Sequence, residues 1–394
     1  MNLSNSNAQD YLKSTSAFYE NHLLNDIIPF WLKHSVDKEK GGFLFSLDQD
    51  GSVLDTDKAM WIHARFVWLL STLYTEVEQK EEWLKLAKHG IDFIEKYGFD
   101  RDGRMFFIVT REGQPLRKRR YLFTESFTCM AYAAYAKAAG KPEYTEKALH
   151  LFRLILKYLQ SPGLLPEKII SATRQMKGHG VLMINLVMCQ ILREVVVDPL
   201  IDQTILNAIS EIENDFMKKE YKAVLETVGP NGEFIDTFDG RLINPGHAIE
   251  TSWFIMREGM YRSDEKIKQL GRKIFDWSWE WGWDKEYGGI IQFRDAKNLP
   301  VTEYWHDMKF WWPQCEAIVA ALYSYKITGD FTYLERHKQI HDYTFDLFPD
   351  NEYGEWFGYF HRDGRLSNTI KGNLWKGPFH IPRMLLVCRN LIEV

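Results

Sequence analysis

The sequence predicts an all-α protein that closes into an (α/α)6 barrel of about twelve helices, with short antiparallel β-hairpins in the loops on one side. Three observations lead to this prediction: helical periodicity over most of the chain, a recurring segment between pairs of helical stretches, and the lack of any composition break. Since no linker or Pro/Ser-rich tract interrupts residues 1–394, we expect one domain, and closed barrels regularly exceed the usual single-domain length.

The helical stretches are defined by apolar residues that recur at three- and four-residue intervals, which is the strongest sign of a helix in a single sequence. They are Ala8–Lys33, Lys58–Glu78, Glu81–Tyr97, Phe123–Ala139, Glu143–Gln160, Gln175–Glu194, Leu200–Lys218, Gly246–Tyr261, Asp264–Trp281, Trp312–Thr328, Phe331–Phe348 and Phe379–Glu393.

The recurring segment resembles a β-hairpin and lies between pairs of helical stretches. Its clearest copies are Asp37–Gly51, Asp284–Phe293 and Asp350–Gly364; weaker copies are Phe99–Val109 and Lys219–Val228, and a degenerate sixth is expected at Ser161–Arg174. The copies lie roughly 60 residues apart, which is longer than the common solenoid repeats. Six helix pairs with hairpins on one side would form a ring whose inner helices direct their ends at one cavity.

Composition and charge exclude several classes of protein. Hydrophobic residues at 45% and charged residues at 26% are typical of a soluble globular protein with a large core. A net charge of -5 and a pI near 6.2 argue against a nucleic-acid partner, which would require a concentrated basic surface. The single basic cluster, residues 117–120, is short and is interpreted as a solvated loop.

Targeting signals and clustered thiols are also missing from the sequence. No apolar run reaches membrane length, and the N-terminus has no signal-peptide pattern, so we expect a cytoplasmic protein with no membrane partner. Cys129, Cys189, Cys315 and Cys388 lack CxxC spacing, which favours a reducing compartment and no metal site. Aromatic residues make up 15% of the chain, with 14 Trp, and such side chains suit sugar rings as well as packing.

Two histidines occupy matching positions at the starts of predicted helices. His380 follows Gly377-Pro378, with Arg383 three residues later, and His247 follows Pro245-Gly246, with Glu250 three residues later. Residues three apart share one helix face, and the first turn is the positive end of the helix. Each histidine alone could be a buried residue beside a helix cap, but the repetition of the pattern favours a shared functional site.

Two further stretches are expected to reach the same cavity. In Tyr304–Glu316, Pro313 is expected to start a helix and place Glu316 on its first turn, although a carboxylate there could simply favour the helix dipole. Trp312 and His306 of this stretch are expected to contact substrate. Arg65 interrupts an apolar helix face, so it should meet a carboxylate or a ligand oxygen unless it extends to the surface.

This set of residues favours proton transfer at a carbon atom. A histidine pKa near 6.5 allows the neutral ring to take a proton and the imidazolium to return one near neutral pH. Two such groups on opposite faces of one carbon suit epimerisation or aldose–ketose isomerisation of a sugar, with arginine stabilising the enediolate oxygen. Inverting glycoside hydrolysis is the rival chemistry on this fold, because Glu250, Glu316 and Asp307 offer carboxylates.

Several long motifs, in order, resemble the N-acylglucosamine 2-epimerase family, in the branch that includes renin-binding proteins. They are Asn244-Pro-Gly-His247-x-x-Glu250, Asp307-Met-Lys-Phe-Trp-Trp-Pro-Gln-x-Glu316, Glu352-Tyr-Gly-Glu-Trp-Phe-Gly-Tyr359 and Gly377-Pro-Phe-His380-x-Pro-Arg383.

The resemblance implies an (α/α)6 barrel, usually dimeric, that interconverts N-acetyl-D-glucosamine and N-acetyl-D-mannosamine at C2. It also implies that His247 and His380 transfer the proton, while Arg65 and Glu316 contact substrate. Glu250 is expected to orient His247 or bond a hydroxyl, and Arg383 to bind substrate. Cellobiose 2-epimerases, mannose isomerases and a non-catalytic binding protein are the alternatives. Phe379 and the residues after His380 favour the N-acyl branch.

No cofactor is needed for the proposed chemistry, and no metal is expected. ATP is implied only by the resemblance, as an activator that is not consumed. The chain has no GxxxxGK[ST] loop, and residues 177–180 lack the further glycine of a dinucleotide fingerprint, so no nucleotide site can be named. The expected partner is a small sugar, in a homodimeric protein.

Overall fold

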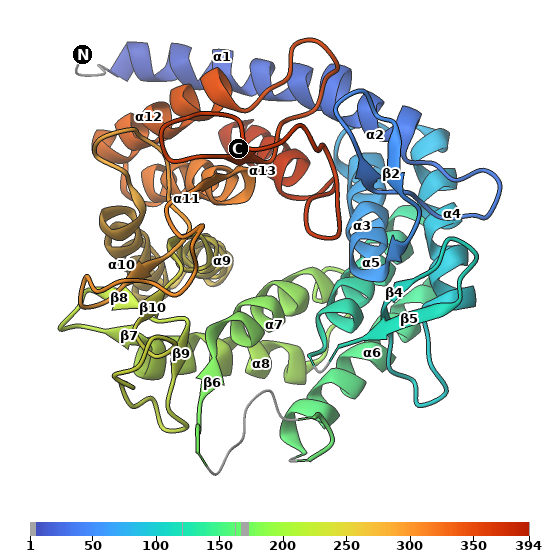
Figure 1. Cartoon of the computed structure of the whole chain (residues 1–394), viewed down its shortest axis with the longest axis horizontal. Helices are drawn as coiled ribbons and strands as arrows, with labels where there is room; N and C mark the ends of the chain where they lie inside the picture. Colours follow the sequence, from blue (N-terminus) through green and yellow to red (C-terminus); the bar gives the residue numbers. More distant parts are fainter. Residues whose placement is uncertain (1–4, 120, 162, 167–172, 394) are drawn as a thin grey trace.

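The computed structural model describes residues 5–119, 121–161, 163–166 and 173–393, and most of these residues are helical (Figure 1). The helices are α1 (Asn5–His22), η1 (Leu23–Ile27), α2 (Ile28–His34), α3 (Met60–Glu76), α4 (Glu81–Tyr97), α5 (Phe123–Ala139), α6 (Pro142–Gln160), α7 (His179–Leu192), α8 (Pro199–Glu211), η2 (Ile212–Phe216), α9 (Pro245–Arg262), α10 (Glu265–Gly282), α11 (Trp311–Thr328), α12 (Phe331–Leu347) and α13 (His380–Glu393). Among them, no helix is long and apolar enough to cross a membrane.

The helices form two concentric rings. Helices α3, α5, α7, α9, α11 and α13 pack against one another in this order, and α4, α6, α8, α10, α12 and α1 cover them from outside. The inner ring closes between α13 and α3, where the rings of Trp68 and Phe379 lie 5.5 Å apart. This arrangement confirms the predicted (α/α)6 barrel.

The inner helices are enclosed on nearly all sides, and their sequences reflect it. Helices α3, α7 and α11 are apolar around most of their circumference, whereas the outer helices α4 and α10 bury one face only. The predicted first helix is one continuous rod with a π-helical turn, η1, between α1 and α2. Wide turns of this kind open the backbone ladder of an otherwise regular helix.

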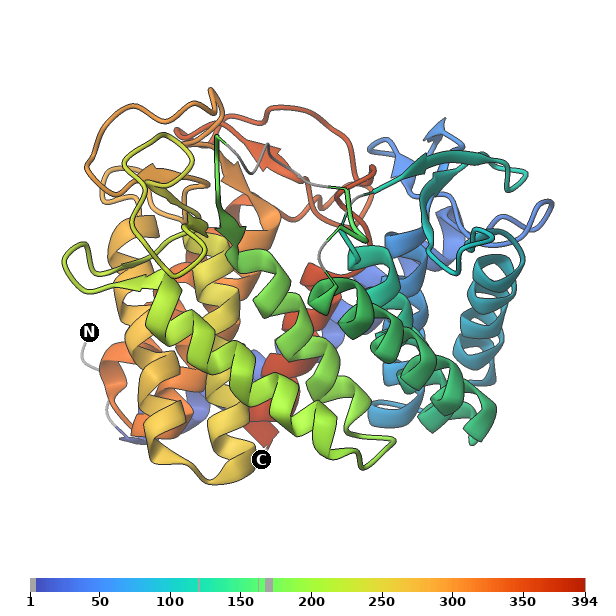
Figure 2. The ribbon, with the colours of Figure 1, turned by 90° about the horizontal axis from the view of Figure 1, so that it is seen from below.

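The strands are short and lie at one end of the barrel, together with the long loops (Figure 2). They are β1 (Ser46–Leu47), β2 (Val53–Asp55), β3 (Lys58–Ala59), β4 (Phe106–Val109), β5 (Pro115–Lys118), β6 (Lys177–Gly178), β7 (Met217–Lys218), β8 (Ala223–Val224), β9 (Thr227–Val228), β10 (Leu242–Ile243), β11 (Arg294–Asp295), β12 (Lys309–Phe310) and β13 (Tyr359–Phe360).

Only some of these strands form local hairpins. Pairs β1–β2, β4–β5 and β7–β8 are antiparallel hairpins of the predicted kind. The pairs β3–β4, β6–β9, β10–β11 and β12–β13 instead join a strand before an inner helix to the hairpin region of a neighbouring repeat. The sheets therefore link the repeats around the ring, which the sequence did not predict. The degenerate copy expected at Ser161–Arg174 lies mostly outside the described residues.

A buried ion pair explains the recurring aspartate of the hairpin segments. In the three clearest copies the aspartate accepts backbone N–H groups two and three residues later, and pairs with a buried lysine at 2.8–3.0 Å. The pairs are Asp37–Lys58, Asp284–Lys309 and Asp350–Lys371. Each lysine also donates to the carbonyl of a glycine with positive φ: Gly41, Gly288 or Gly354. Since Lys58 and Lys309 directly precede α3 and α11, their pairs fix the turn to the start of that helix, whereas Lys371 lies further ahead of α13.

Candidate active site

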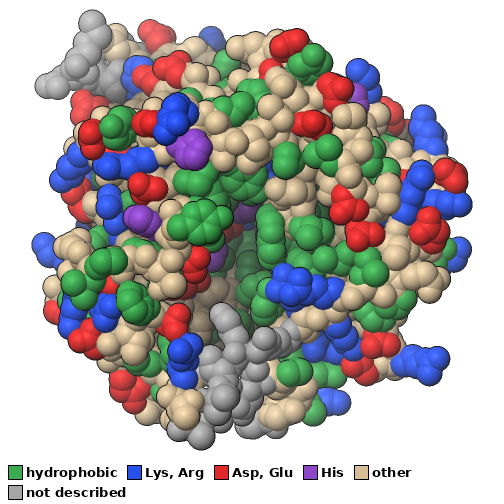
Figure 3. All heavy atoms as spheres, in the orientation of Figure 1, with side chains coloured by type: hydrophobic (Ala, Val, Ile, Leu, Met, Phe, Trp, Pro, Cys, Tyr) green, Lys and Arg blue, Asp and Glu red, His purple; other side chains and the backbone are tan. Residues whose placement is uncertain are grey.

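The first turns of the inner helices surround a hollow at the end of the barrel that carries the strands (Figure 3). His247 is the third residue of α9, and His380 is the first residue of α13. Trp312, on the first turn of α11, lies between them, with its ring 5.2 Å from that of His247 and 5.8 Å from that of His380. Three residues far apart in sequence are therefore brought together at the mouth of the barrel.

His380 is held by the carboxylate of Glu316, which also accepts hydrogen bonds from Arg383 and Trp253. Its Nδ1 lies 2.7 Å from Oε1 of Glu316, and the same oxygen accepts a bond from Nη2 of Arg383 at 2.7 Å. The other oxygen of Glu316 accepts a bond from Nε1 of Trp253 at 2.8 Å. Burial and the nearby guanidinium of Arg383 lower the pKa of His380 well below its usual value. His380 is therefore a neutral imidazole near neutral pH.

His247 is held by a different carboxylate and has the opposite protonation preference. Asn244 caps helix α9 by accepting a bond from the backbone N–H of His247 at 3.1 Å. Nδ1 of His247 lies 3.0 and 3.1 Å from the two oxygens of Glu226. Burial lowers the pKa of His247, but the charge of Glu226 and its hydrogen bond to the ring, together with the charges of Glu250 and Glu316, outweigh this effect and raise the pKa above its usual value. The two histidines thus favour different charges in one site.

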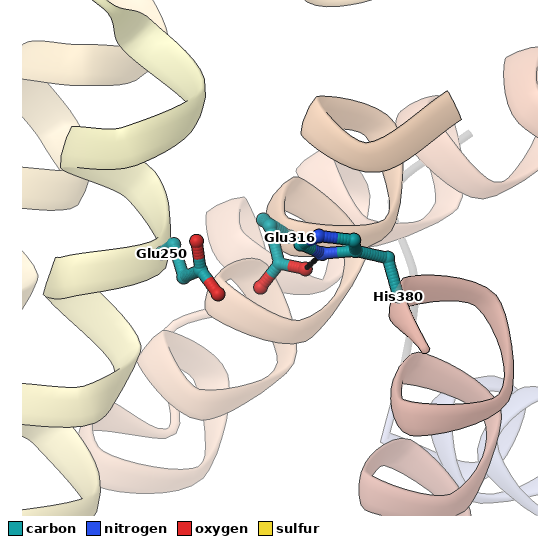
Figure 4. A group of neighbouring side chains, drawn as sticks. All are labelled: Glu250, Glu316 and His380. Atoms are coloured by element: carbon teal, nitrogen blue, oxygen red, sulfur yellow. Dashed lines mark hydrogen bonds and ion pairs between the residues drawn. The ribbon is translucent and has the colours of Figure 1, made fainter. Parts of the chain in front are cut away.

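Glu250, Glu316 and His380 form a buried group that resembles a metal site (Figure 4). Ligand atoms of Glu250, Glu316 and His380 lie within 4.8 Å of one another. Nη2 of Arg383 donates to both Glu250 and Glu316, so a guanidinium supplies the positive charge that these carboxylates require. Because the arginine already pairs with both carboxylates, we interpret the group as a fixed ion-pair cluster that positions His380.

Arg65 is a buried cation that contacts aromatic rings. Its guanidinium lies 4.0 Å from the rings of Trp61 and Phe127 and 4.4 Å from that of Phe379. Among the described residues it makes no hydrogen bond or ion pair, and its Nε is buried without a partner. Burial lowers its pKa to about 9. A buried guanidinium without a carboxylate partner is suited to an oxygen atom of a bound ligand.

The structure corrects the expected positions of Glu316 and Glu250, and it shows where His306 lies. Helix α11 begins at Trp311, before Pro313, so Glu316 lies on the second turn and deeper than the histidines. Glu250 pairs with Arg383, so it does not orient His247 by a hydrogen bond. His306 lies on a loop, where its Nδ1 contacts the carbonyl of Glu303 at 2.9 Å, and none of its described contacts joins it to the two catalytic candidates.

Glu226 is the site residue that the sequence did not predict. It lies in the weak hairpin copy Lys219–Val228, between β8 and β9, and the pattern there shows only turn and strand residues. Its backbone accepts a bond from the N–H of His179 and donates to the carbonyl of Leu242, which holds the segment against the starts of α7 and α9. In the sequence, only the weak resemblance of Lys219–Val228 to the recurring segment could have indicated that this stretch reaches the cavity.

Comparison with known proteins agrees with this geometry. The N-acylglucosamine 2-epimerase (GlcNAc 2-epimerase) family matches residues 41–381, a range that contains both histidines. The N-acylglucosamine 2-epimerase of Bos taurus is 34% identical over 383 residues, which cover 94% of this chain and 89% of the bovine protein. The chain belongs to the N-acylglucosamine 2-epimerase family. The membership predicted from the four motifs is confirmed.

More distant relatives of the chain are cellobiose 2-epimerases. The enzyme from Dictyoglomus turgidum is 24% identical, and the alignment covers 93% of this chain and 95% of that protein. The solved structure of cellobiose 2-epimerase from Bacillus thermoamylovorans B4167 has a TM-score of 0.85 at 24% identity, covering 97% of this chain and 100% of the other. This likeness shows a shared barrel fold.

Proposed function

We propose that the protein is a sugar 2-epimerase that interconverts N-acetyl-D-glucosamine and N-acetyl-D-mannosamine by moving a proton at C2. The observation that carries this proposal is the pair of histidines on either side of Trp312, each bound to a carboxylate through Nδ1. With Nδ1 engaged, Nε2 of each ring is the atom that exchanges a proton with substrate. The N-acyl preference is supported by the mammalian relatives, which share more identity with this chain than the cellobiose epimerases.

The different environments of the two histidines indicate which one acts as the base and which as the acid at the start of a reaction cycle. Neutral His380 takes the C2 proton from the open-chain sugar, and the electrons of the C–H bond form an enolate with the C1 carbonyl. Protonated His247 then gives a proton to C2 on the opposite face, which completes the epimerisation. Turnover leaves His380 protonated and His247 neutral, which is the arrangement that the reverse reaction requires.

Arg65 and the aromatic residues complete this mechanism. The negative charge of the enolate develops on the C1 oxygen, and fixed cations at such an oxygen usually contribute the largest single stabilisation. Arg65 is the buried cation available for this oxygen, while Arg383 is committed to Glu250 and Glu316. Trp312 separates the histidines and offers an apolar face to a sugar ring.

Glycoside hydrolysis is less well supported by the same contacts. Inverting hydrolysis requires one carboxylic acid and one carboxylate that activates water. Glu250 and Glu316 both bind the guanidinium of Arg383, so neither is free to contact a leaving group or to activate water. The second candidate function is the same reaction with cellobiose or mannose as the preferred sugar. It is supported by the cellobiose 2-epimerases, which share the barrel fold and align with this chain over most of its length.

The remaining features of the proposal rest on the sequence and on the family. The chemistry requires no cofactor, and charge and hydropathy favour a cytoplasmic protein without a nucleic-acid or membrane partner. The family resemblance adds ATP as an activator that is not consumed, and a homodimer.

Proton NMR in D₂O tests the reaction and the substrate together. N-acetylmannosamine, N-acetylglucosamine, mannose and cellobiose are incubated with the protein, with and without ATP. Deuterium at C2 with interconversion of the two N-acetyl sugars is the expected result. Exchange with mannose or cellobiose alone would move the protein to the second candidate, and no exchange on any sugar would refute epimerisation.

A further inference from the structure

A second group of polar side chains lies at the opposite end of the barrel from the histidines. Each of the six inner helices contributes one residue near its C-terminal end or just beyond it. These residues are Glu76, Lys137, Glu194, Arg257, Tyr323 and Asn390. We call them the lower polar ring. They surround a basin of about 300 Å³, and none of them contributes to the proposed reaction.

The charges of the lower polar ring balance one another. Glu194 accepts bonds from Lys137 at 2.9 Å and from Arg257 at 3.1 Å, while Glu76 accepts a bond from the amide of Asn390 at 2.8 Å. Two carboxylates and two cations therefore face the basin with no net charge. Burial and the nearby charge of Glu194 raise the pKa of Glu76.

The walls of the basin are aromatic and aliphatic. Trp68, Trp253 and Tyr323 line it together with Ile191 and Leu386, and the rings of Trp253 and Tyr323 are stacked at 5.8 Å. Pockets of this size that combine an apolar wall with a few convergent polar groups are typical of small-molecule sites.

Trp253 separates the basin from the active site and belongs to both. Its ring lines the basin, and its Nε1 donates to the Glu316 oxygen opposite the one that holds His380. The guanidinium of Arg383 lies 5.2 Å from the same ring. A ligand that moves Trp253 would therefore change the position of Glu316 and, through it, of His380.

From this arrangement we infer that the basin is a second binding site for an uncharged, polyhydroxylated ring of monosaccharide size. A charged ligand would meet both signs of charge at similar range and gain little, and a purely apolar ligand would desolvate the lower polar ring without new hydrogen bonds. Sugar hydroxyls donate and accept, so they match both the carboxylates and the cations. The apolar face of such a ring packs on Trp68 or Tyr323.

The site gives the protein a means to respond to sugar concentration at the end of the barrel remote from the reaction. Binding in the basin is independent of the proposed epimerisation, and only its effect on rate depends on that proposal. Because Trp253 contacts Glu316 directly, occupancy changes the turnover number more than the affinity of the active site.

The test is a crystal structure of the full chain with N-acetylglucosamine at saturating concentration, for the parent and two variants. Ala134→Trp fills the basin, since Ala134 lines it, and Ala138→Trp adds the same bulk to the same helix outside the lining residues. We expect a sugar ring in the basin of the parent and of Ala138→Trp, and none in Ala134→Trp. If Ala134→Trp does not fold, Thr75→Trp, at an exposed lining position, replaces it.

Initial rates supply the second measurement. The parent and Ala138→Trp should deviate from a hyperbolic dependence on sugar concentration, whereas Ala134→Trp should follow a hyperbola with its activity at low sugar retained within about twofold. A parent structure with no sugar in the basin would overturn the second site, whatever the turnover. If the parent basin holds no sugar and Ala134→Trp changes the oligomeric state, the basin is instead a contact between protein chains.

Discussion

His247 and His380 occupy equivalent places in the repeat, yet their surroundings differ in one respect that decides their chemistry. His380 is the more buried, and its carboxylate partner Glu316 is shared with Arg383 and Trp253. The side chain of His247 is 31% exposed, and Glu226 contacts it with both oxygens. The same residue type on the first turn of an inner helix is thus a base in one setting and an acid in the other, because neighbouring charge outweighs burial in only one of them.

The largest expected effect comes from removing either histidine. His247→Ala and His380→Ala should each lower kcat by about 10²–10⁴-fold, since a positioned acid or base contributes that much. The measurement is the rate of C2 deuterium incorporation by NMR. His150→Ala, on the exposed face of outer helix α6, is the matched control and should retain activity. Turnover within about tenfold of the parent in both site variants would contradict the assignment.

Removing Arg383 tests the shared carboxylate. Arg383→Ala leaves Glu250 and Glu316 buried without their cation, and breaking such a buried cluster should cost about 3–5 kcal/mol in the free energy of unfolding. Urea denaturation followed by circular dichroism measures this loss. Arg153→Ala, which removes an exposed arginine 3.8 Å from Asp198, should change stability by less than about 0.5 kcal/mol. Equal stability of the two variants would show that the cluster is not a fixed pair.

Glu226→Gln tests the second carboxylate through the pH dependence of the rate. Glu226 raises the pKa of His247, so its loss should lower that pKa. Where His247 acts as the acid, activity declines as pH rises through this pKa, and the falling limb should therefore move to lower pH in the variant. The lower pKa would leave less imidazolium at any pH above the parent's value.

The control for this experiment is Glu220→Gln, an exposed position in the same hairpin segment. It should leave the pH profile of kcat unchanged. An unchanged profile in Glu226→Gln as well would mean that Glu226 contributes to folding only, and that the contrast between the histidines has another cause.

Buried histidines outside the site allow a direct comparison of protonation with His247, and this comparison has the smallest expected effect. Burial lowers the pKa of His63 and of His337 to about 3, and the stronger influences on these rings include no carboxylate that reverses the effect. Both should stay neutral in the folded protein down to about pH 4, while His247 gains its proton above 6.5. Nitrogen-15 NMR of the imidazole rings measures this order.

The same two histidines make stability depend on pH. Because their pKa in the folded protein lies below the unfolded value near 6.5, the unfolded chain binds more protons as pH falls. Stability should be complete above pH 6.5 and decline as pH falls from there towards the folded values. A urea midpoint that stays constant between pH 7 and pH 4 would contradict the lowered pKa values.

The sequence by itself determined the helices, the ring and the family. Periodicity at three and four residues is local, so nearly every helix was predicted within a few residues, and the motifs around His247 and His380 marked the site. The starts of α9 and α13 were also predictable, because a proline and a glycine shortly before each histidine act on the backbone next to it.

Only the tertiary structure decided which charges meet. Glu226 and His247 are 21 residues apart, Glu316 and His380 are 64 apart, and Glu250 and Arg383 are 133 apart. No local pattern states which carboxylate lies on which histidine, because ring closure and the close packing of the loops set those distances. The placement of Glu226 on His247, and of Arg383 between Glu250 and Glu316, therefore came from the closed barrel. These contacts give two similar histidines opposite protonation states.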